Sequence, residues 1–159
     1  MGLFRRLLGG RGADDRPIKP QRLDYLNEAL ALERQGDYDA AITSYRLALR
    51  DHPREPRILQ NLAIALSRVG NSEDAIRHYR LALEGDPSLA GAHYGLAFLL
   101  QKRGDPDGAM QHLRAFLAQP PKGPDAHKWI EHATRALREL GSAPPAAATP
   151  PRRLSAEAP

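Results

Sequence analysis

The sequence contains no cysteine. Disulfide frameworks, thiolate zinc sites, iron–sulfur clusters and cysteine nucleophiles are therefore excluded. Long hydrophobic runs are also missing, since no stretch approaches the roughly 20 apolar residues that a membrane-spanning helix needs. Hydrophobic residues make up 42% and charged residues 26% of the 159 positions, which is typical of a soluble globular protein. A chain of this length indicates one domain with its own core.

The sequence motifs of known catalytic sites are missing as well. There is no His-Glu-x-x-His, no Gly-x-Ser-x-Gly, no phosphate-binding glycine loop and no dinucleotide fingerprint. His127 and His132 are five positions apart, which places them on different faces of a helix. Adjacent acidic residues fall at expected helix starts, where they complement the helix dipole. We therefore predict no catalytic residue, no metal site and no cofactor.

The chain does contain an internal repeat of 34 residues. Gly36, Gly70 and Gly104 share this spacing. Four further columns keep the same period, namely Pro53, Pro87 and Pro121; Ala41, Ala75 and Ala109; Tyr45, Tyr79 and Leu113; and Ala48, Ala82 and Phe116. Because all the columns agree in register, they indicate a tandem array of one structural unit.

Each unit is predicted to form two helices. In the second unit, Leu59, Leu62 and Leu66 recur at intervals of three and four, which places them on one helical face. Gly70 then ends the first helix, and Asn71 caps the second. The proline column follows the second helix and prevents it from continuing. The alanines within the units are expected to act as spacers where helices cross.

The pattern of Leu62-Ala63, Gly70, Ala75, Tyr79, Ala82 and Pro87 resembles the tetratricopeptide repeat, a helix–turn–helix unit of 34 residues. The resemblance implies an all-α fold, a right-handed α-solenoid. We expect three repeats, at residues 22–55, 56–89 and 90–123. A capping helix at 124–140 is expected to cover the last repeat with a polar outer face.

The two ends of the chain differ from the repeats. Residues 141–159 are rich in alanine and proline, and we expect a disordered tail there. Residues 1–20 are expected to form a basic amphipathic segment and a linker. A helix at the start of this segment would separate Arg5 and Arg6 from an apolar side formed by Leu3, Phe4, Leu7 and Leu8. That pattern suits a surface of anionic lipid, although an inert or partner-docking end remains the alternative, because so short a helix is marginal.

The formal net charge of +4 also belongs to the ends. Residues 1–20 have five basic and two acidic side chains, and residues 141–159 have two basic and one acidic. The remaining 16 basic and 16 acidic side chains in residues 21–140 balance. A nucleic-acid-binding protein concentrates positive charge on its folded surface, so we predict no nucleic-acid partner.

The resemblance further implies a concave groove lined by the first helix of each unit. The implied partner-binding positions are Leu26, Asn27, Leu30, Arg57, Gln60, Asn61, Ile64, Arg68, Tyr94, Phe98, Lys102 and Trp129, with Leu23, Gln101, Lys128 and His132 beside them. Chaperone-binding members of the family hold a C-terminal carboxylate in a clamp of polar side chains. Only Asn61 matches that clamp, because Leu26, Leu30, Gly91 and Gly95 occupy its other positions, and we exclude this ligand class.

The groove is therefore expected to have an apolar and aromatic floor with a basic rim that includes Arg34. Such a surface favours a protein or peptide segment with apolar anchors and acidic flanks. The competing interpretation is that these residues pack between helices or against the chain's own tail. We predict a non-enzymatic, cytoplasmic adaptor, with a peripheral membrane-associated assembly factor as the alternative. Self-association is compatible with both, since small arrays of this kind often associate through their edges.

Overall fold

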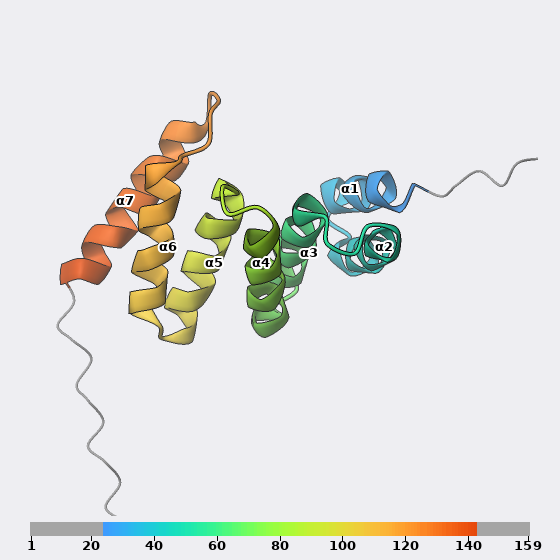
Figure 1. Cartoon of the computed structure of the whole chain (residues 1–159), viewed down its shortest axis with the longest axis horizontal. Helices are drawn as coiled ribbons and strands as arrows, with labels where there is room; N and C mark the ends of the chain where they lie inside the picture. Colours follow the sequence, from blue (N-terminus) through green and yellow to red (C-terminus); the bar gives the residue numbers. More distant parts are fainter. Residues whose placement is uncertain (1–23, 143–159) are drawn as a thin grey trace, which may run out of the picture.

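The computed structural model describes residues 24–142, which form seven α-helices. They are α1 (Tyr25–Gln35), α2 (Tyr38–Asp51), α3 (Pro56–Arg68), α4 (Ser72–Gly85), α5 (Ala90–Arg103), α6 (Pro106–Ala118) and α7 (Ala126–Ser142). Successive helices pack against each other in chain order, from α1 at one end of an elongated array to α7 at the other (Figure 1). The predicted all-α array is confirmed. No helix within residues 24–142 is long and apolar enough to cross a membrane.

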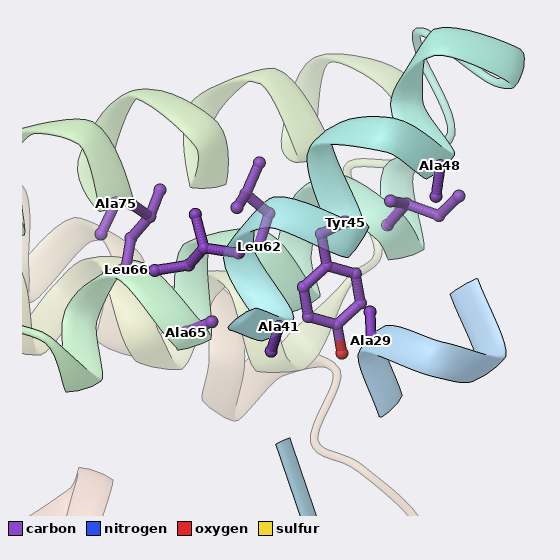
Figure 2. Close-up of a cluster of buried hydrophobic side chains, with 10 residues drawn as sticks. Ala29, Ala41, Tyr45, Ala48, Leu62, Ala65, Leu66 and Ala75 are labelled. Atoms are coloured by element: carbon purple, nitrogen blue, oxygen red, sulfur yellow. The ribbon is translucent and has the colours of Figure 1, made fainter. Parts of the chain in front are cut away.

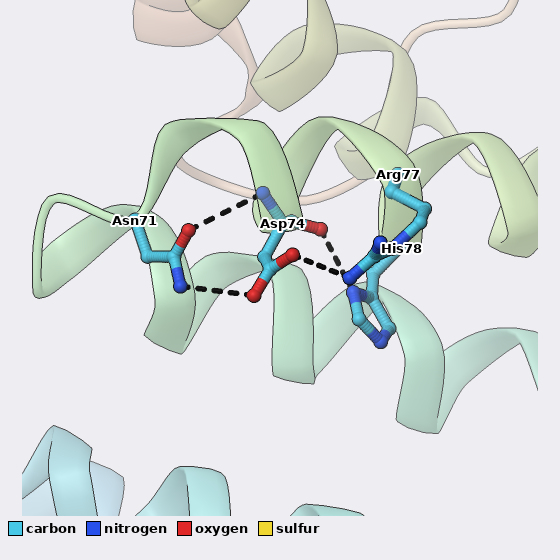
Figure 3. A network of polar contacts seen from close by, with 4 residues as sticks. All are labelled: Asn71, Asp74, Arg77 and His78. Carbon is cyan, nitrogen blue, oxygen red and sulfur yellow. Dashed lines mark hydrogen bonds and ion pairs between the residues drawn. The ribbon is translucent and has the colours of Figure 1, made fainter.

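Polar caps fix the start of the second helix in each repeat. Asp37, Asn71 and Asp105 accept hydrogen bonds from the backbone N–H groups three residues later, at 3.1, 3.3 and 3.0 Å. Figure 3 shows this cap on α4, where the Asn71 side-chain amide also donates to the Asp74 carboxylate at 3.0 Å. Asp74 in turn pairs with Arg77. The acidic residue at this helix start therefore has a structural role, as predicted.

The glycine column allows the sharp turn inside each repeat. Gly36, Gly70 and Gly104 have φ angles of 81°, 84° and 85°, a left-handed conformation that glycine adopts without steric cost. Ala41, Ala75 and Ala109 then lie near the start of α2, α4 and α6, where each is fully buried. Helices pack about 8–10 Å apart only where side chains at the crossing are small. The structure thus confirms the predicted helix ends and spacers.

The buried side chains form three clusters that merge into one core along the array. Figure 2 shows the first cluster, where the Tyr45 ring lies close to Ala29 of α1 and Ala41 of α2. Burial raises the pKa of Tyr45, and its hydroxyl donates a hydrogen bond to the Glu33 carboxylate at 2.5 Å. Leu99 packs against the first and second clusters, and Leu140 against the second and third. The array is therefore continuous from its first repeat to its last helix.

The last helix covers the third repeat. Ala133 and Ala136 are buried against α6, whereas Arg135 and Arg138 remain exposed. The helix begins at Ala126, two residues after the predicted start, because the preceding residues form a turn that closes with the Ala126 N–H donating to the Gly123 carbonyl at 3.2 Å. It continues to Ser142, so residues 141 and 142 are helical, although we expected them in the tail. The rest of the predicted tail and the N-terminal segment lie outside the described residues.

We expect Gly95→Ala to lower the free energy of unfolding by about 1–3 kcal/mol, although alanine is the better helix former by about 1 kcal/mol. An added Cβ at Gly95 would overlap the buried ring of Tyr79, which packs between α4 and α5. Urea unfolding followed by circular dichroism measures the change. Gly141→Ala is the control, because no atom lies within 4 Å of its added Cβ. Equal unfolding midpoints for the two variants would contradict this packing.

A second stability prediction concerns the histidine pair between α5 and α6. His93 Nδ1 lies 2.9 Å from His112 Nδ1, and His93 Nε2 lies 2.9 Å from the Pro87 carbonyl. Burial lowers the pKa of His112, the charges of His93 and Arg80 lower it further, and Asp105 partly opposes them. The folded chain therefore favours neutral His112, while the unfolded chain binds its proton at a pKa of about 6.5. Stability is therefore full above about pH 6.5 and falls as the pH drops from there through the lowered pKa of folded His112.

We therefore expect the urea midpoint to fall between about pH 7.5 and pH 5, and to fall less in the His112→Gln variant. His127→Gln is the matched control, because His127 is exposed on α7. Identical pH profiles for wild type and His112→Gln would show that His112 makes no such contribution.

Candidate functional site

A groove of about 690 Å³ lies on the surface formed by residues 24–142, mainly between α3, α5 and α7. These are the first helices of the second and third repeats and the capping helix. The groove is lined by Ile64, Ser67 and Arg68 of α3, Tyr79 of α4, Gly91, Tyr94, Gly95, Phe98, Leu99 and Lys102 of α5, Phe116 of α6, Pro121, and Trp129 and His132 of α7. It is therefore open between the last two repeats rather than along the whole array.

One side of the groove is an aromatic wall made by Tyr94, Phe98, Trp129 and His132. The Tyr94 ring lies 4.7 Å from Phe98 and 5.3 Å, edge-on, from Trp129, measured between centroids. His132 stacks on Phe98 at 4.7 Å, and its Nδ1 lies 2.5 Å from the Tyr94 hydroxyl. Burial raises the pKa of Tyr94, so the hydroxyl remains protonated at neutral pH. These contacts hold α7 against α5 and fix the shape of the wall.

The aromatic wall is only partly covered by the protein itself. Tyr94 reaches inward, with its ring centroid 5.2 Å from that of the buried Phe116. Trp129 is 49% exposed, an unusual state for a large apolar side chain in contact with other aromatic rings. The wall is therefore anchored in the core at one end and available to a partner at the other.

The other side of the groove has a basic pair, Arg68 and Lys102. Both side chains are exposed, and both lie in the last turn of their helices, α3 and α5. The Arg68 guanidinium carbon lies 5.9 Å from the Tyr38 ring centroid. Burial raises the pKa of Tyr79, and the Arg68 charge acts in the opposite direction. Arg68 thus contributes positive potential to the groove floor as well as to its edge.

The structure brings together half of the residues that the sequence placed at the partner site. The groove lining includes Ile64, Arg68, Tyr94, Phe98, Lys102 and Trp129, together with the neighbouring His132. It does not include Gln101 or Lys128, and Leu23 lies outside the described residues. The aromatic and basic residues that do meet belong to α3, α5 and α7, whereas Arg34 on α1 and Arg57 in the first turn of α3 do not line the groove.

The other predicted residues lie on α1 and in the first turns of α3, and they are not part of the groove lining. Leu26 and Leu30 pack against the first core cluster, and the Asn27 amide donates to Asp24 at 2.6 Å. Asn61 lies beside the Tyr45 hydroxyl, whereas Arg57 is exposed. The Gln60 amide lies next to Gly91, near the edge of the groove.

Sequence reasoning missed the groove floor. Tyr79 and Phe116 belong to repeat columns that we used to establish the period, and both side chains are almost fully buried. Tyr79 reaches the groove beside Gly95, whose missing side chain leaves room for the ring, and Gly91 lines the groove one helical turn earlier. These glycines are four positions apart and therefore share one face of α5. That spacing was the available signal, and it indicates where the floor is open.

The titratable side chains of the groove are few. Among residues 24–142, no three histidine, aspartate or glutamate side chains are placed to hold a metal ion. The groove lining has no carboxylate, and its one histidine, His132, is already in contact with the Tyr94 hydroxyl. The lining is mostly apolar and aromatic, with a few polar and charged groups.

Comparisons with known proteins agree with this geometry. Two family models, both described as tetratricopeptide repeat, match residues 26–90 and 68–131. No curated protein matches the sequence of this chain. Among solved structures, the Sgt2 TPR domain from Aspergillus fumigatus is 24% identical, with 82% of this chain and 89% of that chain covered and a TM-score of 0.62.

Two further solved structures were determined with partners. PcrH in complex with the chaperone binding region of PopD is 17% identical, with 74% of this chain and 88% of that chain covered and a TM-score of 0.67. The TPR2B domain of yeast Sti1 in its pHsp70 complex is 19% identical, with 74% and 93% covered and a TM-score of 0.64. At these identities the likeness concerns the fold. Family models and fold together show that this chain belongs to the tetratricopeptide repeat family, with three repeats closed by a capping helix.

Proposed function

We propose that this chain is a non-enzymatic adaptor that holds a segment of another protein in the groove between α3, α5 and α7. The observation that carries the proposal is the aromatic wall, whose Trp129 is 49% exposed although it contacts Tyr94. Partly exposed aromatic side chains at the centre of a preformed hollow are the residues that contribute most to protein–protein binding. An apolar anchor from a partner would cover the exposed face of this ring.

The likeness to peptide-bound structures supports this proposal without identifying the partner. PcrH was solved with a region of PopD, and yeast Sti1 with pHsp70. Both have the same helical array as this chain. Nothing in the groove of this chain favours a catalytic role over binding, since its titratable side chains are Arg68, Lys102, two tyrosines and a histidine.

Trp129→Ala is the sharpest test of the groove. Peptides without tryptophan are first selected from a random display library on the full chain, and their affinities are then measured by fluorescence polarisation. We expect Trp129→Ala to weaken binding by at least about tenfold, which corresponds to about 1.4 kcal/mol. Because Trp129 is half exposed, its removal should leave the helical circular dichroism signal unchanged.

Arg135→Ala is the matched control, since Arg135 lies on the exposed face of the same helix. Tyr94 and Phe98 serve less well as first targets, because both pack against the third core cluster and their removal changes stability as well as binding. Selected peptides that bind wild type and Trp129→Ala equally would refute the proposal.

The membrane alternative rests on residues 1–10, which lie outside the described residues. Arg5 and Arg6 stand among Leu3, Phe4, Leu7 and Leu8, and we propose that this segment adds weak affinity for anionic lipid. The full chain is expected to float with vesicles that contain phosphatidylserine, and a chain lacking residues 1–10 is expected to remain at the bottom of the gradient. Vesicles of phosphatidylcholine alone provide the control. Equal flotation of both chains would remove this second role.

A further inference from the structure

The basic pair of the groove belongs to a column of the repeat. Arg34, Arg68 and Lys102 are 34 residues apart, and each lies in the last turn of a first helix, α1, α3 or α5. A cation in that position complements the helix dipole, which explains the column as a whole. Only Arg68 and Lys102 also line the groove. A comparison with Arg34 therefore separates the effect of a cation at the helix end from the effect of a cation in the groove.

The basic pair is not neutralised by its surroundings. Among residues 24–142, no carboxylate lies within ion-pair distance of Arg68 or Lys102, and none lines the groove. The adjacent Arg103 is different, since it lies 3.5 Å from the Glu73 carboxylate and 3.6 Å from that of Asp105. Within residues 24–142, the cation that faces away from the groove is thus paired with carboxylates, whereas the two that line the groove are not.

The charge of the groove also argues against the chain's own ends as its occupant. Residues 1–20 carry a net charge of +3, and residues 141–159 a net charge of +1. Both ends would bring positive charge to a positive edge, which is unfavourable at short range. The charge that complements this edge has to come from another chain.

We propose that the occupant is an acidic segment of another protein, with a bulky apolar residue against the aromatic wall and carboxylates at the basic pair. This proposal rests on the proposed function and names its ligand. Arg68 and Lys102 occupy the same repeat position on α3 and α5, which contact each other. Helices in contact typically lie about 8–10 Å apart, and an extended chain advances about 3.3 Å per residue, so we expect two acidic residues about three positions apart to reach the pair.

The selection described above tests the composition of this ligand directly. We expect the enriched peptides to combine a phenylalanine or leucine with two aspartates or glutamates about three positions apart. Synthetic counterparts with asparagine or glutamine in place of the acids should bind at least about tenfold more weakly at low salt. This difference should shrink at high salt, because the pair is exposed. Enriched peptides without acidic residues would overturn the inference.

Charge reversal tests the basic pair itself. The double variant Arg68→Glu/Lys102→Glu should lose at least about tenfold in affinity for the acidic peptide, and should prefer a counterpart with lysines in place of the acids. Arg34→Glu is the matched control, which should change the affinity by less than about twofold, because Arg34 occupies the same helix position outside the groove. Circular dichroism confirms that each variant is folded.

The two proposals fail in different ways. If Trp129→Ala abolishes binding but charge reversal does not, the groove binds a segment without acidic character, and this inference is wrong while the proposed function stands. If no selected peptide depends on Trp129, the proposed function and this inference are both wrong. Equal losses from Arg34→Glu and from the double variant would mean that charge acts at long range, and would overturn the assignment to the pair.

Discussion

The structure depends on the close packing of neighbouring helices at positions without bulky side chains. A pair of helices cannot bury its apolar face alone, so each repeat is stable only against the next. Ala41, Ala75 and Ala109 allow that contact at the same place in each repeat, and all three are fully buried. Leu99 and Leu140 then join neighbouring clusters into one core. The array is thus a chain of local contacts rather than a single central core.

The same constraint shapes the groove. Gly95 lets the Tyr79 ring pass between α4 and α5, so the floor of the groove is part of the packing that holds two repeats together. On the opposite side, Tyr94 contacts Phe116 below and Trp129 above. One ring therefore links the core of the third repeat to the capping helix. The lining of the groove is thus also part of the helix packing, and a preformed surface of this kind loses less entropy when a partner binds.

The sequence predicts the repeats well and the groove only in part. Columns such as Gly36, Gly70 and Gly104 recur at a fixed period, so each repeat provides independent support for the turn. The capping helix has no equivalent copy, and nothing periodic fixes how Trp129 meets Tyr94 across 35 residues of sequence. The resemblance also implied that the first helices of all three repeats line one groove. In the structure, Leu26 and Leu30 of α1 pack against the first core cluster instead. Local patterns determine helices, whereas the site depends on how different helices meet.

The distribution of charge over the folded surface is likewise not given by the composition of the sequence. The 16 basic and 16 acidic residues of positions 21–140 balance, yet balance over the whole surface says nothing about one face. Lys102 and Arg103 are neighbours in sequence, but successive residues of a helix point about 100° apart. Lys102 lies in the groove, while Arg103 lies near Glu73 and Asp105. An array with no net charge can therefore have a groove lined only by positive charges. The position of a basic residue within the repeat predicts where that charge lies, whereas the net charge of the array does not.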